Sequence, residues 1–223
     1  MVSRQSPGAG KRAIGERRPR MAPEDRERQI LAAATEYFSE VGIDGQTREL
    51  AARLGVSQSL IFKYFSSKEV LLEKIYEDLY LTRWNPLWEE TVVDRTRSIE
   101  DRMICFYRDY ANMILRKEWI RIFLFSGLRD SNIHSRFLQL LQKRIFVPLA
   151  EELRHALEHD GVDKKPLTEL EIQMVWSSHS KIFYYGLRKW VYKTETSVGI
   201  DEFIECEVQS FLAGYPYFLK KNV

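Results

Sequence analysis

TRELAARLGVSQSLIFKYFSSK, residues 47–68, decides how the rest of this chain can be organised. Its two halves each carry an apolar stripe at helical spacing, which predicts two short helices. The stripes are Leu50, Ala51 and Leu54, then Ile61 and Phe65. Gly55 interrupts the pattern, Val56 can fill the corner, and Ser57 is a good N-cap because its hydroxyl can accept an N–H of the first turn.

Two helices joined by a short, Gly-containing turn are typical of a helix-turn-helix. The second helix is polar on the side away from its apolar stripe, which suits a helix that lies in the major groove of DNA. The residues on that side are Gln58, Ser59, Lys63 and Tyr64. We therefore predict a DNA-reading head.

The flanking sequence extends this head on both sides. Upstream, residues 28–45 predict an amphipathic helix that ends at Gly42, with Ile30, Ala34, Phe38 and Val41 on one face. Downstream, Ser66 and Glu69 have the spacing of a capping box at the start of a connecting helix. We expect that helix to span about Lys68–Arg83 and to break at Trp84-Asn85-Pro86, because the residue before proline avoids the helical region.

The runs ILAAATEYFSEVGIDG and RELAARLGVSQSLIFKYFSSKEVLLEKIY resemble the tetracycline-repressor (TetR) family of bacterial regulators. The resemblance covers roughly residues 26–76 and is architectural beyond them. It implies a homodimer in which the heads read DNA and the body holds an inducer.

The residue types and the resemblance together suggest which side chains contact DNA. Arg48 can bond guanine and Gln58 can bond adenine in the major groove. The resemblance implies base contacts by Arg48, Gln58, Ser59 and Leu60, and phosphate contacts by Thr47, Lys63, Tyr64 and Lys68. Leu60 has two readings, one as an inward-facing residue and one as a contact to a thymine methyl group.

The sequence departs from the family pattern at two places. Phe62 stands where the family usually has a phosphate-binding tyrosine, so that hydroxyl is missing. Gly45-Gln46 replaces a threonine-rich helix start, which leaves Asp44, Gly45 or Thr47 to cap the first helix of the pair.

Residues 1–20 form a basic tail, with six Lys or Arg against one Glu. Its Gly and Pro content predicts disorder. One reading is a solubilising extension or a start-site artefact; the other is an arm that follows phosphates or enters a minor groove.

The remaining composition narrows the class of protein. Hydrophobic content of 44% suits a globular protein, and no apolar run is long enough to span a bilayer. The basic N-terminus lacks the apolar block of a secretory signal, and two cysteines suit a reducing compartment. We expect a cytoplasmic protein with no membrane partner and no cofactor.

The segments after residue 84 show helical periodicity and no strand alternation. We expect an all-α fold with three parts: a disordered tail (1–20), a helix-turn-helix domain with its connecting helix (21–83), and a larger ligand-binding and dimerisation domain (84–223). The expected helices are about Ser98–Lys117, Trp119–Leu128, Asn132–His159 (kinked or split near Pro148), Leu167–Tyr192 and Ile200–Tyr217.

This larger region is rich in aromatic residues, which suits an apolar ligand pocket with a few polar groups. The candidate pocket residues are Met103, Tyr107, Tyr110, Trp119, Phe123, Trp176, His179 and Phe183. The alternative for each one is ordinary core. The resemblance favours a cavity, and the aromatic content favours an apolar or aromatic effector.

The last two expected helices carry apolar faces with small residues nearby, which suits a two-fold contact between copies. These faces are Leu170, Val175, Ile182, Gly186 and Trp190 on one helix, and Phe203, Ile204, Val208, Phe211, Leu212 and Tyr215 on the other. The alternative is that the two helices pair within one chain.

Catalytic and metal-binding patterns are weak. Glu151, His155 and His159 share a helical face, yet no HExxH string is present, and neither Cys105 nor Cys206 belongs to a CxxC motif. We expect no enzyme activity.

The resulting hypothesis is a homodimeric repressor of a near-palindromic operator, in which an effector changes the separation of the heads. Two alternatives stay open: an architectural DNA-binding protein that uses its tail, and a helical enzyme with a vestigial head.

Overall fold

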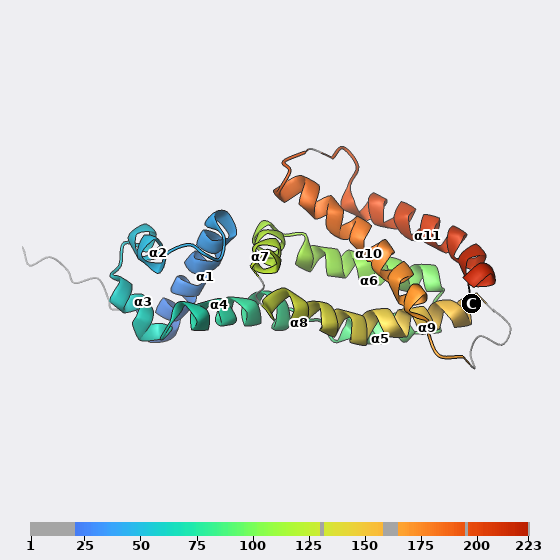
Figure 1. The fold of residues 1–223 in the computed structure, drawn as a ribbon, viewed down its shortest axis with the longest axis horizontal. Helices are drawn as coiled ribbons and strands as arrows, with labels where there is room; N and C mark the ends of the chain where they lie inside the picture. Colours follow the sequence, from blue (N-terminus) through green and yellow to red (C-terminus); the bar gives the residue numbers. More distant parts are fainter. Residues whose placement is uncertain (1–20, 130–131, 158–164, 195, 223) are drawn as a thin grey trace, which may run out of the picture.

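The computed structural model describes residues 21–129, 132–157, 165–194 and 196–222, and every regular element within them is helical. The molecule is elongated, with a small head and a larger helical body (Figure 1). The predicted all-α class, with a helix-turn-helix head and a larger helical domain, is confirmed. The basic tail, residues 1–20, lies outside the described residues.

Four helices build the head: α1 (Pro23–Val41), α2 (Thr47–Leu54), α3 (Gln58–Tyr64) and the start of α4 (Lys68–Tyr76). The predicted apolar stripes meet in one core, with Ile30, Ala34, Phe38, Leu50, Ala51, Ile61 and Phe65 all buried. Val41 was expected on the buried face and is instead 42% exposed. It is the last residue of α1, where the chain leaves the helix and the core.

The caps of the head follow the predictions only in part. Ser57 caps α3, and its hydroxyl accepts the Leu60 N–H at 3.2 Å. For α4 the cap is Ser67 rather than Ser66, since Ser67 accepts the Val70 N–H at 3.2 Å. The predicted capping box is therefore wrong by one residue, because α4 begins at Lys68 and a cap acts from the position directly before the helix.

The start of α2 has no side-chain cap of its own, so none of the three predicted capping residues is correct. Instead, the Tyr37 hydroxyl of α1 lies 3.1 Å from the Gln46 carbonyl oxygen and 2.8 Å from the Glu49 carboxylate. The loop before α2 lies close against α1 at Gly45: a Cβ there would lie 2.5 Å from Val41 Cγ2 and 2.7 Å from Tyr37 Cε1. A side chain at position 45 would therefore require these α1 side chains to shift.

The connection to the body runs through α4 and then a π-helical turn, η1 (Glu77–Leu81). The predicted break at Trp84-Asn85-Pro86 is present, although the helix ends two residues before Arg83. The short helix α5 (Leu87–Val93) follows and was not predicted. Seven residues with two buried side chains, Trp88 and Val92, carry too weak a periodic signal.

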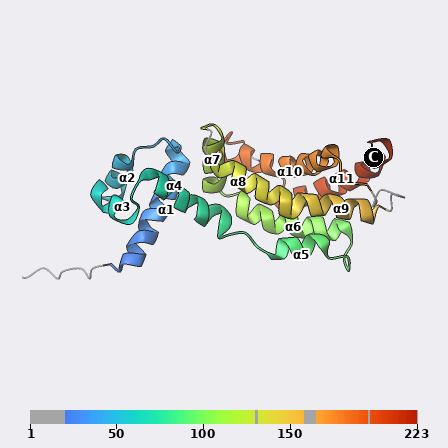
Figure 2. The ribbon, with the colours of Figure 1, turned by 60° about the horizontal axis from the view of Figure 1, so that its bottom comes forward.

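The body contains α6 (Ile99–Ile114), α7 (Lys117–Gly127), α8 (Asn132–Leu141), η2 (Gln142–Phe146), α9 (Val147–Ala156), α10 (Glu169–Trp190) and α11 (Ile200–Asn222). Helix α6 is central, because it contacts α5, α9, α10 and α11. Figure 2 shows α5 on one side of α6 and the α10–α11 pair on the other. Helix α7 joins the two parts of the molecule by contacting both α1 and α10.

The predicted body helices lie close to the observed ones. The irregularity expected near Pro148 is present as the π-helical η2, which directly precedes α9. Helix α11 continues to Asn222, beyond the predicted end at Tyr217, even though Pro216 lies inside it.

A buried ion-pair network ties α9 to α6. The Glu152 carboxylate accepts a hydrogen bond from Arg102 at 2.8 Å and another from Arg95 at 2.8 Å. Burial alone would raise the pKa of Glu152, but hydrogen bonds from the two arginines lower it overall. Arg102 also donates to the Val92 carbonyl oxygen, so the network reaches α5.

Candidate nucleic-acid interface

The residues predicted to contact DNA lie on α2, α3 and the first turn of α4, at the end of the molecule farthest from the body (Figure 1). Arg48, Ser59 and Lys63 are exposed. The half-buried members are Gln58, Leu60, Tyr64 and Lys68. The predicted residues therefore lie on neighbouring helices at one end of the molecule, and their role in DNA binding stays a prediction.

The turn between α2 and α3 depends on Gly55, which has φ +66° in the left-handed region. This conformation favours glycine, because a Cβ would meet the following carbonyl group. The turn sets the direction of α3 and leaves its polar face in solvent.

Thr47 differs from the rest of the set because its side chain is only 7% exposed. Its hydroxyl accepts a hydrogen bond from the Gln58 side-chain amide, with Nε2 and Oγ1 2.7 Å apart. The expected phosphate contact by Thr47 does not fit this burial. Its observed role is to hold the first residue of α3.

The two exposed cations of this surface are free to meet an anion. Neither Arg48 nor Lys63 forms an ion pair with any residue in the described ranges. By contrast, Arg53 at the end of α2 is paired with Glu40 at 2.7 Å. Lys68 is also engaged, since its ammonium lies 5.7 Å from the centre of the Phe38 ring. Phe62, which lacks the tyrosine hydroxyl, is 38% exposed beside these groups.

The head is fastened to the body by Arg121 of α7, which sequence reasoning missed. Its guanidinium donates to the Ser39 carbonyl oxygen (2.5 Å) and the Glu40 carbonyl oxygen (3.2 Å) at the end of α1. A third bond reaches the Trp190 carbonyl oxygen at the end of α10 (3.5 Å). One side chain thus joins the last turns of two helices, where carbonyl groups lack helical partners. No local sequence pattern marks such a residue.

The eight predicted pocket residues gather in one aromatic cluster in the body. The Trp119 and Phe123 rings stack with centres 4.9 Å apart, and Tyr110 Oη lies 3.0 Å from His179 Nε2. Burial lowers the pKa of His179 to about 3, so its ring is neutral at physiological pH. The other members are Met103, Tyr107, Trp176 and Phe183.

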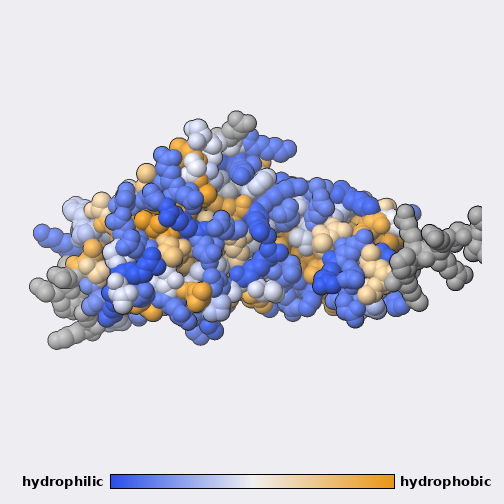
Figure 3. All heavy atoms as spheres, turned by 180° about the vertical axis from the view of Figure 1, so that it is seen from behind, coloured by the Kyte–Doolittle hydropathy of each residue, from blue (hydrophilic) through white to orange (hydrophobic). Residues whose placement is uncertain are grey.

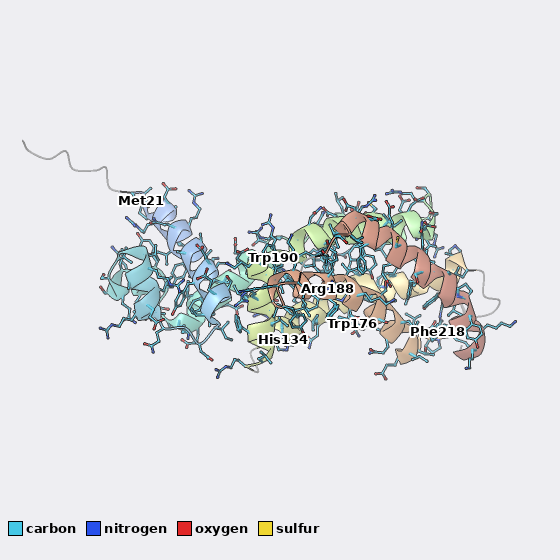
Figure 4. All side chains as sticks on the ribbon, turned by 90° about the horizontal axis from the view of Figure 1, so that it is seen from above. Met21, His134, Trp176, Arg188, Trp190 and Phe218 are labelled. Carbon is cyan, nitrogen blue, oxygen red and sulfur yellow. The ribbon has the colours of Figure 1, made fainter. Side chains whose placement is uncertain are left out.

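Much of this cluster is packed core rather than cavity wall. Met103, Tyr107, Tyr110 and Trp119 are each at most 2% exposed. Surface hollows border the cluster from outside. One of about 510 Å³ borders Trp176, and one of about 770 Å³ borders Phe183. Figure 4 shows Trp176 towards one end of α10, and Arg188 and Trp190 at the end nearer the head.

The predicted self-association faces are largely used within the chain. On α10, Val175, Ile182 and Gly186 are buried, and on α11 Ile204, Val208, Phe211 and Tyr215 are buried. These residues pack against the rest of the body because α10 contacts α6 and α7 while α11 contacts α6. The surface that α10 and α11 expose is more polar; it includes Gln173, Ser177, Ser180 and Tyr184, then Ser210, Ala213, Gly214 and Tyr217.

The structure also bears on the possible metal face of α9 and on membrane-spanning segments. His155 is exposed on α9, while His159 lies outside the described residues, and no metal-binding group of three His, Cys, Asp or Glu occurs in the described part of the chain. None of the described helices is both long and apolar enough to cross a membrane.

The head matches a known protein family. The family of bacterial regulatory proteins called the tetR family matches residues 30–75, from the middle of α1 to the end of α4. The tetracycline repressor protein class A from transposon 1721 of Escherichia coli is 32% identical over 92 residues. That match spans 38% of this chain and 42% of the repressor, so it covers less than half of either protein.

Solved structures extend the likeness to the whole fold. A TetR-like transcriptional regulator from Rhodococcus sp. RHA1 aligns with 87% of this chain and 100% of its own, at 18% identity and a TM-score of 0.62. The ketosteroid transcriptional regulator KstR2 of Mycobacterium tuberculosis aligns with 85% of this chain and 94% of its own, at 15% identity and a TM-score of 0.57. At these identities the likeness concerns the fold alone.

Proposed function

The chain belongs to the TetR family of bacterial regulatory proteins, and from this premise we propose that it is a homodimeric, ligand-responsive repressor of transcription. The observation that carries the proposal is the exposed surface on α2 and α3. There, Arg48 and Lys63 lack ion-pair partners among the described residues, and Gln58 is held in place by Thr47. A DNA-binding protein of this kind works in the cytoplasm.

The proposed recognition divides the work between these residues. Arg48 and Gln58 read base edges, because an arginine can bond two acceptors of guanine and an amide can bond adenine. Ser59 and Leu60 stand beside them on α3. Lys63, Tyr64 and Lys68 meet backbone phosphates, which supply affinity without sequence information.

The proposed dimer uses the exposed faces of α10 and α11, in place of the buried residues first expected. Ser177 and Ser180 on α10, and Ala213 and Gly214 on α11, are exposed small residues that allow close approach of helices. A two-fold contact would place two heads on half-sites about one helical turn (~34 Å) apart.

The proposed response is a change in the spacing of the heads. An effector that binds one arrangement of the body more tightly shifts the population towards it. The connecting helix α4–η1 and the Arg121 junction are the elements that would transmit the change. The proposed effector is small and apolar or aromatic. Equal affinity for the operator with and without saturating effector would refute this response.

The direct test is fluorescence anisotropy with labelled promoter DNA flanking the protein's own gene, and a scrambled duplex as competitor. The wild type should prefer the promoter, and Gln58→Ala should lose most of that preference. Lys63→Ala is the matched variant: it should weaken binding to both duplexes equally and lower the salt dependence by about one counterion. Equal binding of both duplexes by the wild type would instead support an architectural protein that acts through its tail.

A further inference from the structure

The largest hollow named above lies between α10, α11 and the segment that joins them. Its volume of about 770 Å³ falls within the roughly 300–1,000 Å³ of small-molecule sites. Most of its wall is apolar or aromatic, formed by Phe183, Tyr184, Tyr185, Leu187, Val198 and Phe203. From behind, apolar surface is visible beside the turn between α10 and α11 (Figure 3).

Two charged groups in this hollow pair with each other, and a third has no ion-pair partner among the described residues. Lys181 Nζ lies 2.6 Å from Glu207 Oε1. Arg188 also lines the hollow, is half-buried, and forms no ion pair with a residue of the described chain. Its backbone carbonyl accepts the N–H of Thr194 at 2.9 Å, which fixes the last turn of α10 around it. A planar guanidinium beside an apolar wall is well matched to a carboxylate on a flat apolar molecule.

We propose that this hollow binds a small aromatic carboxylate, with the ring against Phe183 and Phe203 and the carboxylate on Arg188. The inference rests on the proposed function in one respect only, because it identifies this ligand with the effector. The site is distinct from the interior cluster predicted from sequence, which is mostly closed, and shares only Phe183 with it.

Phe183 also gives the hollow a connection to the head. Its ring centre lies 5.5 Å from that of Phe123, which lies 6.4 Å from that of Tyr80. Tyr80 belongs to the π-helical turn η1 of the connecting helix, and its hydroxyl donates to the Trp119 carbonyl oxygen at 3.4 Å. A ligand that shifts Phe183 therefore presses on rings packed against the helix that leads to the DNA-binding surface.

The competing occupant of the hollow is a second copy of the chain. Tyr184 and Val198, which line it, are 51% and 44% exposed, and the proposed dimer face lies on the same two helices. Arg188 favours the small anion, because it lines the hollow and forms no ion pair with a described residue.

The test uses full-length protein and two fluorescent probes that differ only in charge, 1-pyrenebutyrate and 1-pyrenebutanol. The carboxylate should saturate one site per chain and bind about tenfold more tightly than the alcohol. Arg188→Gln should remove this preference and leave the affinity for the alcohol unchanged. Arg116→Gln, at an exposed arginine without an ion pair in the described chain, is the control and should behave like the wild type. Circular dichroism confirms that each variant folds.

Equal affinity of the wild type for both probes, or an Arg188→Gln variant that keeps the preference, would overturn the proposal. Light scattering on the same samples tests the competing occupant: if the probe binds only to monomers, the second copy fills the hollow and the proposal is wrong. Hydrogen exchange at residues 77–81 should change on probe binding in the wild type and not in Phe123→Ala.

The two proposals fail separately. Protein that binds the promoter specifically but shows no preference for the carboxylate overturns only this inference. Protein that binds the carboxylate through Arg188 but has no preference for the promoter keeps the site and overturns the proposed function.

Discussion

The side-chain amide of Gln58 donates a hydrogen bond to the hydroxyl of Thr47, with the two heavy atoms 2.7 Å apart. This bond connects the first residue of α3 to the first residue of α2. It leaves the Gln58 carbonyl oxygen and one N–H for a partner outside the protein. The proposed base-reading residue is thus oriented before DNA arrives.

This pairing predicts a coupled effect of the two residues on DNA binding. Gln58→Ala should weaken binding to the specific promoter by ~1–3 kcal/mol. Thr47→Val should cost about 1 kcal/mol, because the amide loses its partner. In anisotropy titrations the double variant should bind like Gln58→Ala, and Thr47→Ser should bind like the wild type. Fully additive losses would show that Thr47 acts on DNA by itself.

The buried carboxylate of Glu152 predicts a large effect on stability. Glu152→Gln leaves the Arg102 guanidinium, which is 3% exposed, without its counter-charge. Removing one partner of a buried ion pair costs about 3–5 kcal/mol. Urea unfolding at pH 7 should report this loss as a lower midpoint. Glu151→Gln, at the exposed neighbouring position, is the control and should change stability by less than about 0.5 kcal/mol.

Because the His179 ring is buried, we expect the stability of the protein to depend on pH. Its folded pKa is lowered to about 3 by burial, while the unfolded chain takes up this proton near pH 6.5. The free energy of unfolding is therefore not reduced by His179 above pH 6.5. It falls as the pH drops towards 3, because the unfolded chain takes up a proton that the folded chain does not bind. At pH 5 the loss is on the order of 2 kcal/mol.

His179→Gln removes this proton and can keep a hydrogen bond to Tyr110. Thermal unfolding from pH 7 to pH 5 should therefore decline less steeply for His179→Gln than for the wild type. His155→Gln, on the exposed face of α9, should follow the wild type. Parallel curves for His179→Gln and the wild type would contradict a buried neutral imidazole.

The hydrogen bonds of Arg121 lead to a prediction about the junction between the head and the body. Arg121→Gln loses hydrogen bonds to carbonyl groups of Ser39, Glu40 and Trp190, and should lower stability by about 1–3 kcal/mol. Hydrogen exchange should also rise in the last turn of α1 while that of α9 stays unchanged. Arg116→Gln should leave both regions as in the wild type. A uniform rise across the chain would mean that the substitution loosens the whole fold rather than the junction.

Sequence reasoning located the head well because its signals are local. The stripe from Leu50 to Phe65, the Gly55 turn and the Ser57 cap each depend on residues a few positions apart. The residues that bind the head to the body act across long separations. Arg121 meets carbonyl groups about eighty positions upstream, and a backbone acceptor leaves no trace in the sequence.

The predictions for the faces of α10 and α11 and for the aromatic residues were limited by the same cause. An apolar stripe on α10 or α11 shows that one face is buried, and it does not show against what. Val175, Ile182, Ile204 and Val208 turned out to be covered by the same chain, so the outer faces are more polar than expected. The aromatic residues likewise signalled burial, and only the three-dimensional arrangement separated the packed rings from those that border a hollow, such as Phe183.

The most direct measurement of the central claim is a nuclease protection footprint on the promoter DNA that flanks the protein's own gene. A dimeric, sequence-reading regulator should protect two related half-sites whose centres are about 10 base pairs, or a small multiple of one helical turn, apart. Gln58→Ala should lose both protected regions at the same concentration. Protection spread evenly along the DNA, or equal protection of a scrambled fragment, would contradict a specific regulator.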